Sequence, residues 1–272
     1  MSAPHVDVVI ARFGSRTARR RDVFLNETVD PEAPIDMAYY FWVIRGASRP
    51  YLVDTGFAAP VGRRRGRTVD ADPFELFAAL GVGPETAPTI IVTHAHYDHI
   101  GNLAAFDRSP LIVSGRELDF WASPLGARGE FGMLTERDEI AALLAADAAG
   151  RVRRVDGDTE LEPGITLLPV GGHTPGQLMV LVETPTGPVL LASDAVHYDE
   201  ELDRDVPFTH LSSLPDSYAA FDRVRALRDR GALVVSGHDP AALALGPALA
   251  DYPDLTAVLG VTPAAEPRKD PR

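Results

Sequence analysis

One apolar strand that runs directly into a group of histidines constrains this chain more than any other feature of its sequence. Residues 89–93 have the apolar, β-branched composition of a buried strand, and His94, His96, Asp98 and His99 follow at once. The chain of 272 residues has eight histidines, so three within six positions is not the density of an ordinary solvated loop. Residues two apart in an extended backbone point to the same side. His94 and His96 can therefore bind one ion, while Asp98 and His99 reach a second point beyond the turn.

Three later apolar runs each lead to a residue of the same chemical kind. These residues are His173 after residues 165–170, Asp194 after 189–193, and His238 after 232–236. Taken singly, each has an ordinary interpretation, as a structural histidine or as a turn or cap aspartate. Together with the first group they provide the imidazole and carboxylate ligands that suit zinc and similar metals. Seven ligands are too many for one tetrahedral ion, so the sequence predicts two divalent metal ions, with zinc expected.

The composition narrows the classes of protein that this chain can belong to. A formal net charge of −13 disfavours a nucleic-acid partner, because proteins that bind this polyanion usually present a basic face. The absence of cysteine excludes disulfide frameworks, thiol nucleophiles and thiolate metal sites. We recognise neither a signal peptide nor an apolar run long enough to span a membrane, so we expect no membrane partner and a cytoplasmic location. The oligomeric state is not specified, and a homodimer is one state that the sequence allows.

Short apolar runs and helical patterns follow one another irregularly along the chain. We expect strands at residues 6–11, 38–44, 51–54, 89–93, 111–114, 165–170, 179–183, 189–193 and 232–236, and helices at 72–80, 135–148 and 217–229, with a further helix beginning within 99–106. This order predicts a mixed α/β (α+β) fold with sheets packed on each other and helices outside. We expect a single domain over residues 1–261 and a disordered Pro- and charge-rich tail over 262–272.

Two stretches, residues 16–21 and 63–67, are rich in arginine. Their ordinary interpretation is a pair of solvated loops, because isolated runs of charge usually lie on the surface. The alternative is that they attract an anionic substrate toward the site. The sequence does not decide between the two.

An ordered set of short motifs resembles the metallo-β-lactamase superfamily. The motifs are Thr93-His94-Ala95-His96-Tyr97-Asp98-His99-Ile100-Gly101, Gly172-His173-Thr174-Pro175-Gly176, Ser193-Asp194 and Gly237-His238, with Asp54-Thr55-Gly56 earlier in the chain. The resemblance covers roughly residues 35–245 and implies an αββα sandwich with the site along one edge. It also implies the role of each ligand: His94, His96 and His173 bind one metal, Asp98, His99 and His238 bind the other, and Asp194 bridges them.

Within the superfamily, residues 39–44 ahead of Asp54-Thr55-Gly56 resemble the N-acyl homoserine lactonases. The resemblance implies a small-molecule lactone or ester substrate and a role in quorum quenching. The chain departs from that group at one position. The lactonases usually have a tyrosine three residues after the bridging aspartate, where it touches the lactone carbonyl, whereas this chain has His197 there and Tyr198 next. A related lactonase, similar to 4-pyridoxolactonase, therefore fits the sequence equally well.

The resemblance implies that metal-bound hydroxide opens the lactone ring, because coordination lowers the pKa of water from about 15.7 to about 7. We expect Asp98 to relay a proton toward the leaving oxygen. We also expect His197 or Tyr198 to donate a hydrogen bond to the oxyanion, with ordinary packing as the alternative for each.

Three further residues are candidates for the substrate pocket. His210 lies in a polar stretch close in sequence to Asp194, and a surface loop is its alternative. Phe131 and Met133 are expected in an apolar wall that faces the acyl part of the substrate, with core packing as their alternative.

Other activities of the same ligand set stay open. A thioester hydrolase resembling glyoxalase II would need a glutathione-binding part, for which little chain remains after His238. A phosphodiesterase of the same superfamily is a second alternative. A flavodiiron oxidoreductase has a glutamate at the position of His96 and needs a flavin domain. A non-catalytic zinc-stabilised binding domain is disfavoured because structural zinc sites are closed and rich in cysteine.

Overall fold

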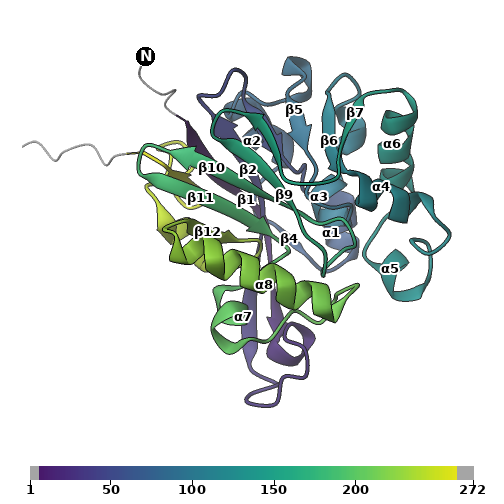
Figure 1. Ribbon diagram of the computed structural model, residues 1–272, viewed down its shortest axis with the longest axis vertical. Helices are drawn as coiled ribbons and strands as arrows, with labels where there is room; N and C mark the ends of the chain where they lie inside the picture. Colours follow the sequence, from purple (N-terminus) through teal and green to yellow (C-terminus); the bar gives the residue numbers. More distant parts are fainter. Residues whose placement is uncertain (1–5, 262–272) are drawn as a thin grey trace, which may run out of the picture.

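Two β-sheets form the centre of the protein in the computed structural model, which describes residues 6–261 (Figure 1). The larger sheet has the strand order β13 (Thr256–Leu259), β1 (Asp7–Arg19), β2 (Pro34–Arg45), β3 (Tyr51–Val53), β5 (Thr89–Ile91), β6 (Leu111–Ser114) and β7 (Val152–Val155), with β4 (Thr68–Val69) paired to β1. The smaller sheet has the order β12 (Leu233–Ser236), β11 (Gly187–Ser193), β10 (Leu178–Thr184), β9 (Ile165–Pro169) and β8 (Thr159–Glu162).

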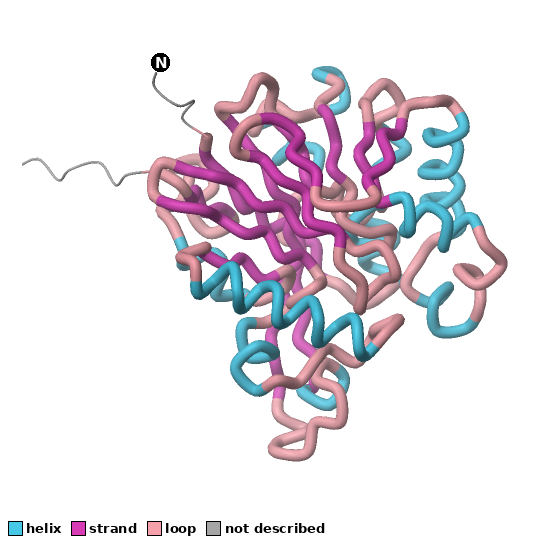
Figure 2. Tube along the Cα trace, viewed as in Figure 1, coloured by secondary structure: helices cyan, strands magenta, loops and turns pink. Residues whose placement is uncertain are grey.

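Helices cover the outer face of each sheet (Figure 2). Those on the side of the larger sheet are α1 (Ala59–Arg64), α2 (Pro73–Ala79), α3 (Tyr97–Ile100), α4 (Gly115–Ala122), α5 (Gly129–Met133) and α6 (Arg137–Ala148). Those on the side of the smaller sheet are α7 (Asp199–Arg204) and α8 (Leu214–Asp229). Short 3-10 turns occupy Arg20–Asp22, Pro84–Thr86, Leu103–Ala105 and Pro240–Leu245. No helix in residues 6–261 is both long enough and apolar enough to cross a membrane.

The alternation of side chains along β2 explains why the sheets can be covered on both faces. Successive residues of a strand point to opposite faces. Phe41 therefore packs toward the helices, with its ring centroid 4.6 Å from that of Phe77 in α2. Trp42 points the other way and joins the cluster between the two sheets. Burial of such large side chains is the main favourable term in folding.

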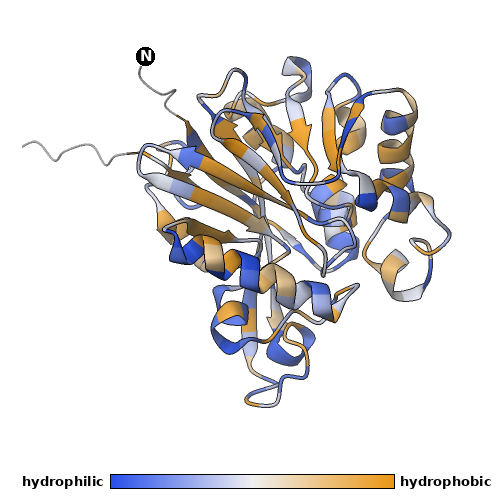
Figure 3. Cartoon of the chain, in the orientation of Figure 1, coloured by the Kyte–Doolittle hydropathy of each residue, from blue (hydrophilic) through white to orange (hydrophobic). Residues whose placement is uncertain are grey.

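The smaller sheet repeats this arrangement against α8. Met179 and Leu190 on its outer face form one buried cluster with Phe221 and Val224 of the helix. Figure 3 shows the apolar central strands and the mixed apolar and polar surface of α8. Three apolar layers thus separate helices, sheet, sheet and helices, and the expected αββα sandwich is confirmed.

The nine expected strands and three of the expected helices are present, with shifted ends. Two expectations are wrong in detail. Residues 16–19 form part of β1, where Arg16 pairs with Met37, because the ladder with β2 extends beyond the apolar run. The helix expected within residues 99–106 is instead α3 followed by a 3-10 turn. The expected tail, residues 262–272, lies outside the described residues.

Candidate metal centre

The predicted ligands come together because they follow strands whose ends meet at one edge of the sandwich. His94 follows β5 of the larger sheet, and His173 follows β9 of the smaller one. Asp194 and His238 follow β11 and β12, which are parallel neighbours with Ser193 opposite Ser236. The structure therefore brings together seven residues spread over 145 positions of the chain, as the sequence predicts: His94, His96, Asp98, His99, His173, Asp194 and His238.

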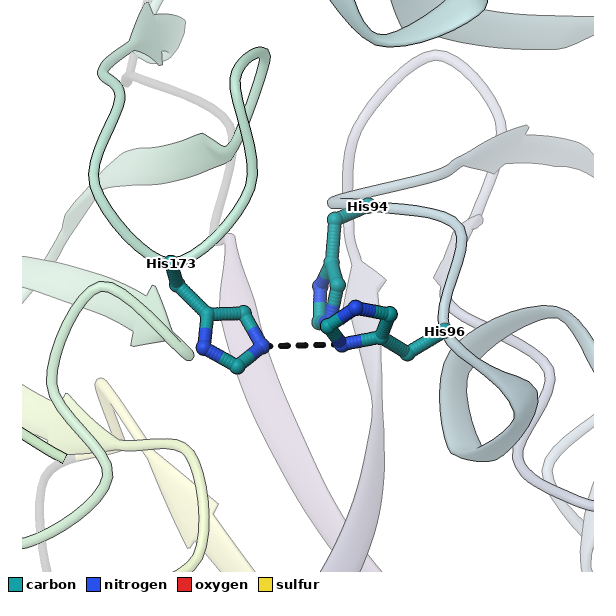
Figure 4. Close-up of side chains that lie close together, drawn as sticks. All are labelled: His94, His96 and His173. Carbon is teal, nitrogen blue, oxygen red and sulfur yellow. Dashed lines mark hydrogen bonds between the residues drawn. The ribbon is translucent and has the colours of Figure 1, made fainter. Parts of the chain in front are cut away.

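The first ligand group consists of His94, His96 and His173 (Figure 4). The Nδ1 atom of His96 lies 3.0 Å from Nε2 of His94 and 2.9 Å from Nε2 of His173. Burial lowers the pKa of all three histidines, to about 3 for His96. The three imidazoles are therefore neutral at neutral pH, which is the form that binds a metal.

The second ligand group consists of Asp98, His99 and His238. Oδ2 of Asp98 is 3.9 Å from Nε2 of His99 and 3.8 Å from Nε2 of His238. Asp194 lies between the two groups, since its Oδ2 is 3.3 Å from Nε2 of His173 and 3.2 Å from Nε2 of His238. Burial opposes ionisation of Asp194, but the surrounding histidines outweigh it and hold the pKa of this carboxyl well below its usual range.

Unsatisfied polar atoms show that these residues fit a bound cation. Nε2 of His99 and Oδ1 of Asp194 are buried and lie 3.2 Å apart, yet neither forms a hydrogen bond of acceptable geometry with any described residue. A buried polar atom without a partner costs about 1–3 kcal/mol, so this arrangement is expected only where a further group completes it. The ligand atoms are imidazole nitrogens and carboxylate oxygens, which suit a pair of divalent transition metals.

Contacts of the Nδ1 atoms, on the side of each ring away from the centre, hold three of the candidate ligand rings in place. Nδ1 of His99 is 2.7 Å from Oδ2 of Asp54, Nδ1 of His173 is 2.9 Å from the carbonyl oxygen of His210, and Nδ1 of His238 is 2.7 Å from that of Ala38. Each contact leaves Nε2 facing the centre and fixes the orientation of the ring.

Glu117 of α4 supports two loops that carry candidate ligands, although no pattern in the sequence predicted this role. Its buried carboxylate accepts hydrogen bonds from the backbone N–H of Ala95 at 2.9 Å and of Gly176 at 3.0 Å, and from Nε1 of Trp121 at 2.7 Å. Ala95 lies between two ligands and Gly176 follows His173. A Cβ atom at Gly176 would lie 2.2 Å from the backbone of Glu117, so only glycine fits. Nothing in the local sequence marks Glu117 as different from a surface glutamate.

The structure places His197 and Tyr198 differently. Nε2 of His197 lies 3.2 Å from Oδ2 of Asp194, and its Nδ1 lies 3.3 Å from the buried carboxylate of Glu201. Although burial opposes the charged form, Asp194 and Glu201 raise the pKa of His197 to about 9. Tyr198 points away from the cluster, and its hydroxyl donates to the carbonyl oxygen of Asp36 at 3.1 Å. Of the two candidates, His197 alone is brought to the ligands.

A cavity opens directly over the ligands. Asp98 and His197 line this cavity, together with three further polar side chains, those of Arg16, Tyr39 and Arg67. An adjoining cavity of about 110 Å³ shares His96 and His173 and is also lined by Phe131, Leu134 and Leu211.

The substrate-pocket candidates divide between these cavities and the surface. His210 lines both cavities, and Phe131 lines the adjoining one with Leu134. Met133 is not brought to the ligands, because it is 48% exposed and lines a separate cavity beside Trp121.

Comparison with known proteins gives the class to which this fold and this site belong. Residues 36–238 match the family model described as the metallo-beta-lactamase superfamily. The match includes all seven candidate ligands. The chain therefore belongs to the metallo-beta-lactamase superfamily, as its motifs predict.

The relatives include proteins named N-acyl homoserine lactonase. One from Bacillus sp is 27% identical over 235 residues, which cover 79% of this chain and 86% of that protein. The crystal structure of a quorum-quenching N-acyl homoserine lactone lactonase has a TM-score of 0.74 at 23% identity, covering 88% of this chain and 94% of the other. An N-acyl homoserine lactone hydrolase solved with the product N-hexanoyl-L-homoserine at its catalytic metal center has a TM-score of 0.73 at 22% identity, covering 87% and 94%. The predicted resemblance to this group is confirmed.

Proposed function

We propose that this chain is a lactonase that hydrolyses the ring ester of an N-acyl homoserine lactone or a related lactone with two divalent metal ions, zinc being the expected metal. The observation that carries the proposal is the position of Asp194. This buried carboxylate lies within 3.3 Å of nitrogens from both ligand groups, directly beneath a cavity. The names of the relatives support a lactone as the substrate.

The two ligand groups define where the metals would bind. His94, His96 and His173 would hold one ion, Asp98, His99 and His238 the other, and Asp194 would contact both. Such a pair, when bound, supplies a water molecule of lowered pKa and polarises the carbonyl group to be cleaved.

Side chains around the metals would handle protons and orientation. Asp98 lines the cavity, so its carboxylate can relay a proton to the oxygen that leaves when the ring opens. His197 also faces the cavity and, through a ring N–H, can donate a hydrogen bond to the carbonyl oxygen as negative charge develops there. Phe131 and Leu134, in the adjoining cavity, provide apolar surface for an acyl chain.

The proposal is tested by metal analysis followed by a lactone assay. Purified protein is expected to contain close to two transition-metal ions per chain. It should release protons from N-hexanoyl homoserine lactone in a weakly buffered indicator solution, because ring opening creates a carboxylic acid. Asp98→Asn should abolish this release, whereas Asp107→Asn, the same change at an exposed residue that lines neither cavity, should not.

Hydrolysis of other substrates in place of lactones would overturn the proposed lactonase function. If the protein cleaved S-lactoylglutathione or a generic phosphodiester and no lactone, it would be a thioester hydrolase or a phosphodiesterase of the same superfamily. If N-acyl homoserine lactones are hydrolysed, the role that follows for the protein is the removal of these signal molecules. The cytoplasmic location and the single-domain organisation remain predictions.

A further inference from the structure

Two arginines reach the cavity above the ligands from parts of the chain that are far apart. Arg16 belongs to β1, and Arg67 immediately precedes β4. These strands are antiparallel neighbours in which Gly14 pairs with Val69 and Ser15 with Thr68. The next position of this register places Arg16 opposite Arg67, and both side chains line the cavity.

Neither guanidinium is neutralised by a carboxylate among the side chains that the structure describes. Nε of Arg16 contacts Sδ of Met37 at 3.2 Å. Arg67 donates from Nε to the hydroxyl of Tyr97 at 2.9 Å and from Nη1 to the carbonyl oxygen of Arg65 at 2.8 Å. Among the groups that the structure describes, none forms a hydrogen bond with the terminal nitrogens of Arg16 or with Nη2 of Arg67, so these atoms can bind a ligand.

Arginines close to these two are neutralised. Arg12 forms an ion pair with Asp70 at 3.2 Å, and Arg65 forms one with Glu136 at 2.8 Å. Two like charges opposite each other in a ladder are destabilising. In a chain of net charge −13, carboxylates are abundant, so two arginines that face each other without one need an explanation.

The carboxylates that line the same cavity do not explain the two unpaired arginines. They are Asp98 and Asp194, and both belong to the proposed metal ligands. Their negative charge would be taken up by the metals, which leaves the positive charge of Arg16 and Arg67 directed at whatever else occupies the cavity.

We propose that the substrate carries a carboxylate in the part that is not cleaved, and that Arg16 and Arg67 bind this carboxylate. The proposal rests on the proposed lactonase activity of the same cavity and specifies its substrate class. A planar guanidinium matches a carboxylate with paired N–H donors. The guanidinium carbon of Arg67 lies 5.8 Å from the ring centroid of Tyr39, a cation-π contact that helps to hold this side chain in the cavity.

The test compares lactones that differ only in this charge. N-succinyl and N-glutaryl homoserine lactone end in a carboxylate at two spacer lengths, and their terminal carboxamides are neutral partners of the same shape. Ring opening produces the same new carboxylate in both members of a pair, so only the second carboxylate differs. We expect the purified metal-loaded protein to favour the carboxylate in kcat/KM by ~10-fold or more in at least one pair, the worth of a charge-assisted hydrogen bond.

Variants assign the preference to the two side chains. Arg16→Gln and Arg67→Gln should each reduce the carboxylate-to-carboxamide ratio of kcat/KM by ~10-fold. Arg63→Gln removes the same charge from an exposed position of the same basic stretch and should leave the ratio unchanged. The ratio of the unmodified protein should also fall as salt is added, because ions screen the charges, and this measurement needs no variant.

A binding measurement separates this proposal from the proposed activity. The matching lactams, with an amide in place of the ring ester, resist hydrolysis, so calorimetry can compare their dissociation constants directly. If no lactone is hydrolysed, the proposed function fails, and tighter binding of the lactam carboxylate would still support the anion site. If the carboxylate and carboxamide forms are hydrolysed equally fast and bound equally well at both spacer lengths, the anion site is overturned while the lactonase stands.

Discussion

Nδ1 of His99 lies 2.7 Å from Oδ2 of Asp54 in the interior of the protein. The same carboxylate accepts a hydrogen bond from the backbone N–H of Thr93 at 2.8 Å. Asp54 therefore connects one ligand to the backbone just ahead of the first ligand pair. We expect Asp54→Asn to lower the affinity of the second metal by ~10- to 100-fold, since partners behind a ligand contribute that much.

Asparagine is a clean replacement at this position. Asp54 has a φ of 61°, and asparagine tolerates this left-handed conformation better than most residues. The affinities are measured by competition with a chromophoric chelator. Asp70→Asn, which alters a partly buried carboxylate that pairs with Arg12 and is not one of the candidate ligands, serves as the control. If both metal affinities of Asp54→Asn equalled those of the unmodified protein, the contact between His99 and Asp54 would not contribute to metal binding.

The fold was predictable where burial follows a simple pattern. β2 and β11 are apolar runs within the core, so their composition marks them. β7 (Val152–Val155) and β8 (Thr159–Glu162) were missed because they contain exposed arginine and glutamate. Their strand conformation comes from pairing with β6 and β9, which a local pattern does not contain.

The clustering of the candidate metal ligands was predictable, because a ligand must be one of a few residue types and each candidate follows the end of a strand. The residues that hold them were not. Glu117 acts through three N–H groups from separate segments, and Asp54 was identified only as part of a short motif. The position of Tyr198 was also beyond the sequence, because its hydroxyl bonds to Asp36, 162 positions away.

Glu117→Gln is expected to weaken both the fold and the metal site. The substitution turns one acceptor oxygen into a donor, so at least one of the N–H groups of Ala95, Gly176 and Trp121 would lose its partner. An unsatisfied buried donor costs about 1–3 kcal/mol, and we expect a loss of that size in the free energy of unfolding by urea. Metal content after dialysis should fall as well, because the ligand loops are loosened.

The matched control for Glu117→Gln is Glu160→Gln, the same chemical change at an exposed position of β8. It should alter neither quantity. Equal stability of Glu117→Gln and the unmodified protein would mean that the buried contacts do not hold the loops.

His197→Phe and Tyr198→Phe should have very different effects on turnover. The ring of His197 stacks on Phe208 with centroids 3.8 Å apart, and phenylalanine can keep this stacking while losing both nitrogens. We expect kcat for the lactone to fall by ~100-fold, the usual cost of removing a donor to the oxyanion. Tyr198→Phe removes a hydroxyl that bonds to Asp36, so it should mainly cost about 1 kcal/mol of stability. A larger loss of kcat in Tyr198→Phe than in His197→Phe would reverse the assignment.

Glu27 should govern part of the acid stability of the protein. Its buried carboxylate receives hydrogen bonds from Nη1 of Arg204 at 2.6 Å and from the backbone N–H of Val29 at 2.9 Å, and these lower its pKa from 4.5 to about 2. Because the folded pKa is the lower one, the stabilisation is complete above pH 4.5 and is lost as the pH falls toward 2. Glu27→Gln should therefore lower the free energy of unfolding by about 2 kcal/mol at pH 7 and by progressively less in acid.

Urea unfolding at pH 7, 5, 4 and 3 measures the difference in stability between Glu27→Gln and the unmodified protein, with Glu32→Gln, the same change at an exposed residue, as the control. A difference that stayed constant over this range would show that the charge of Glu27 does not contribute.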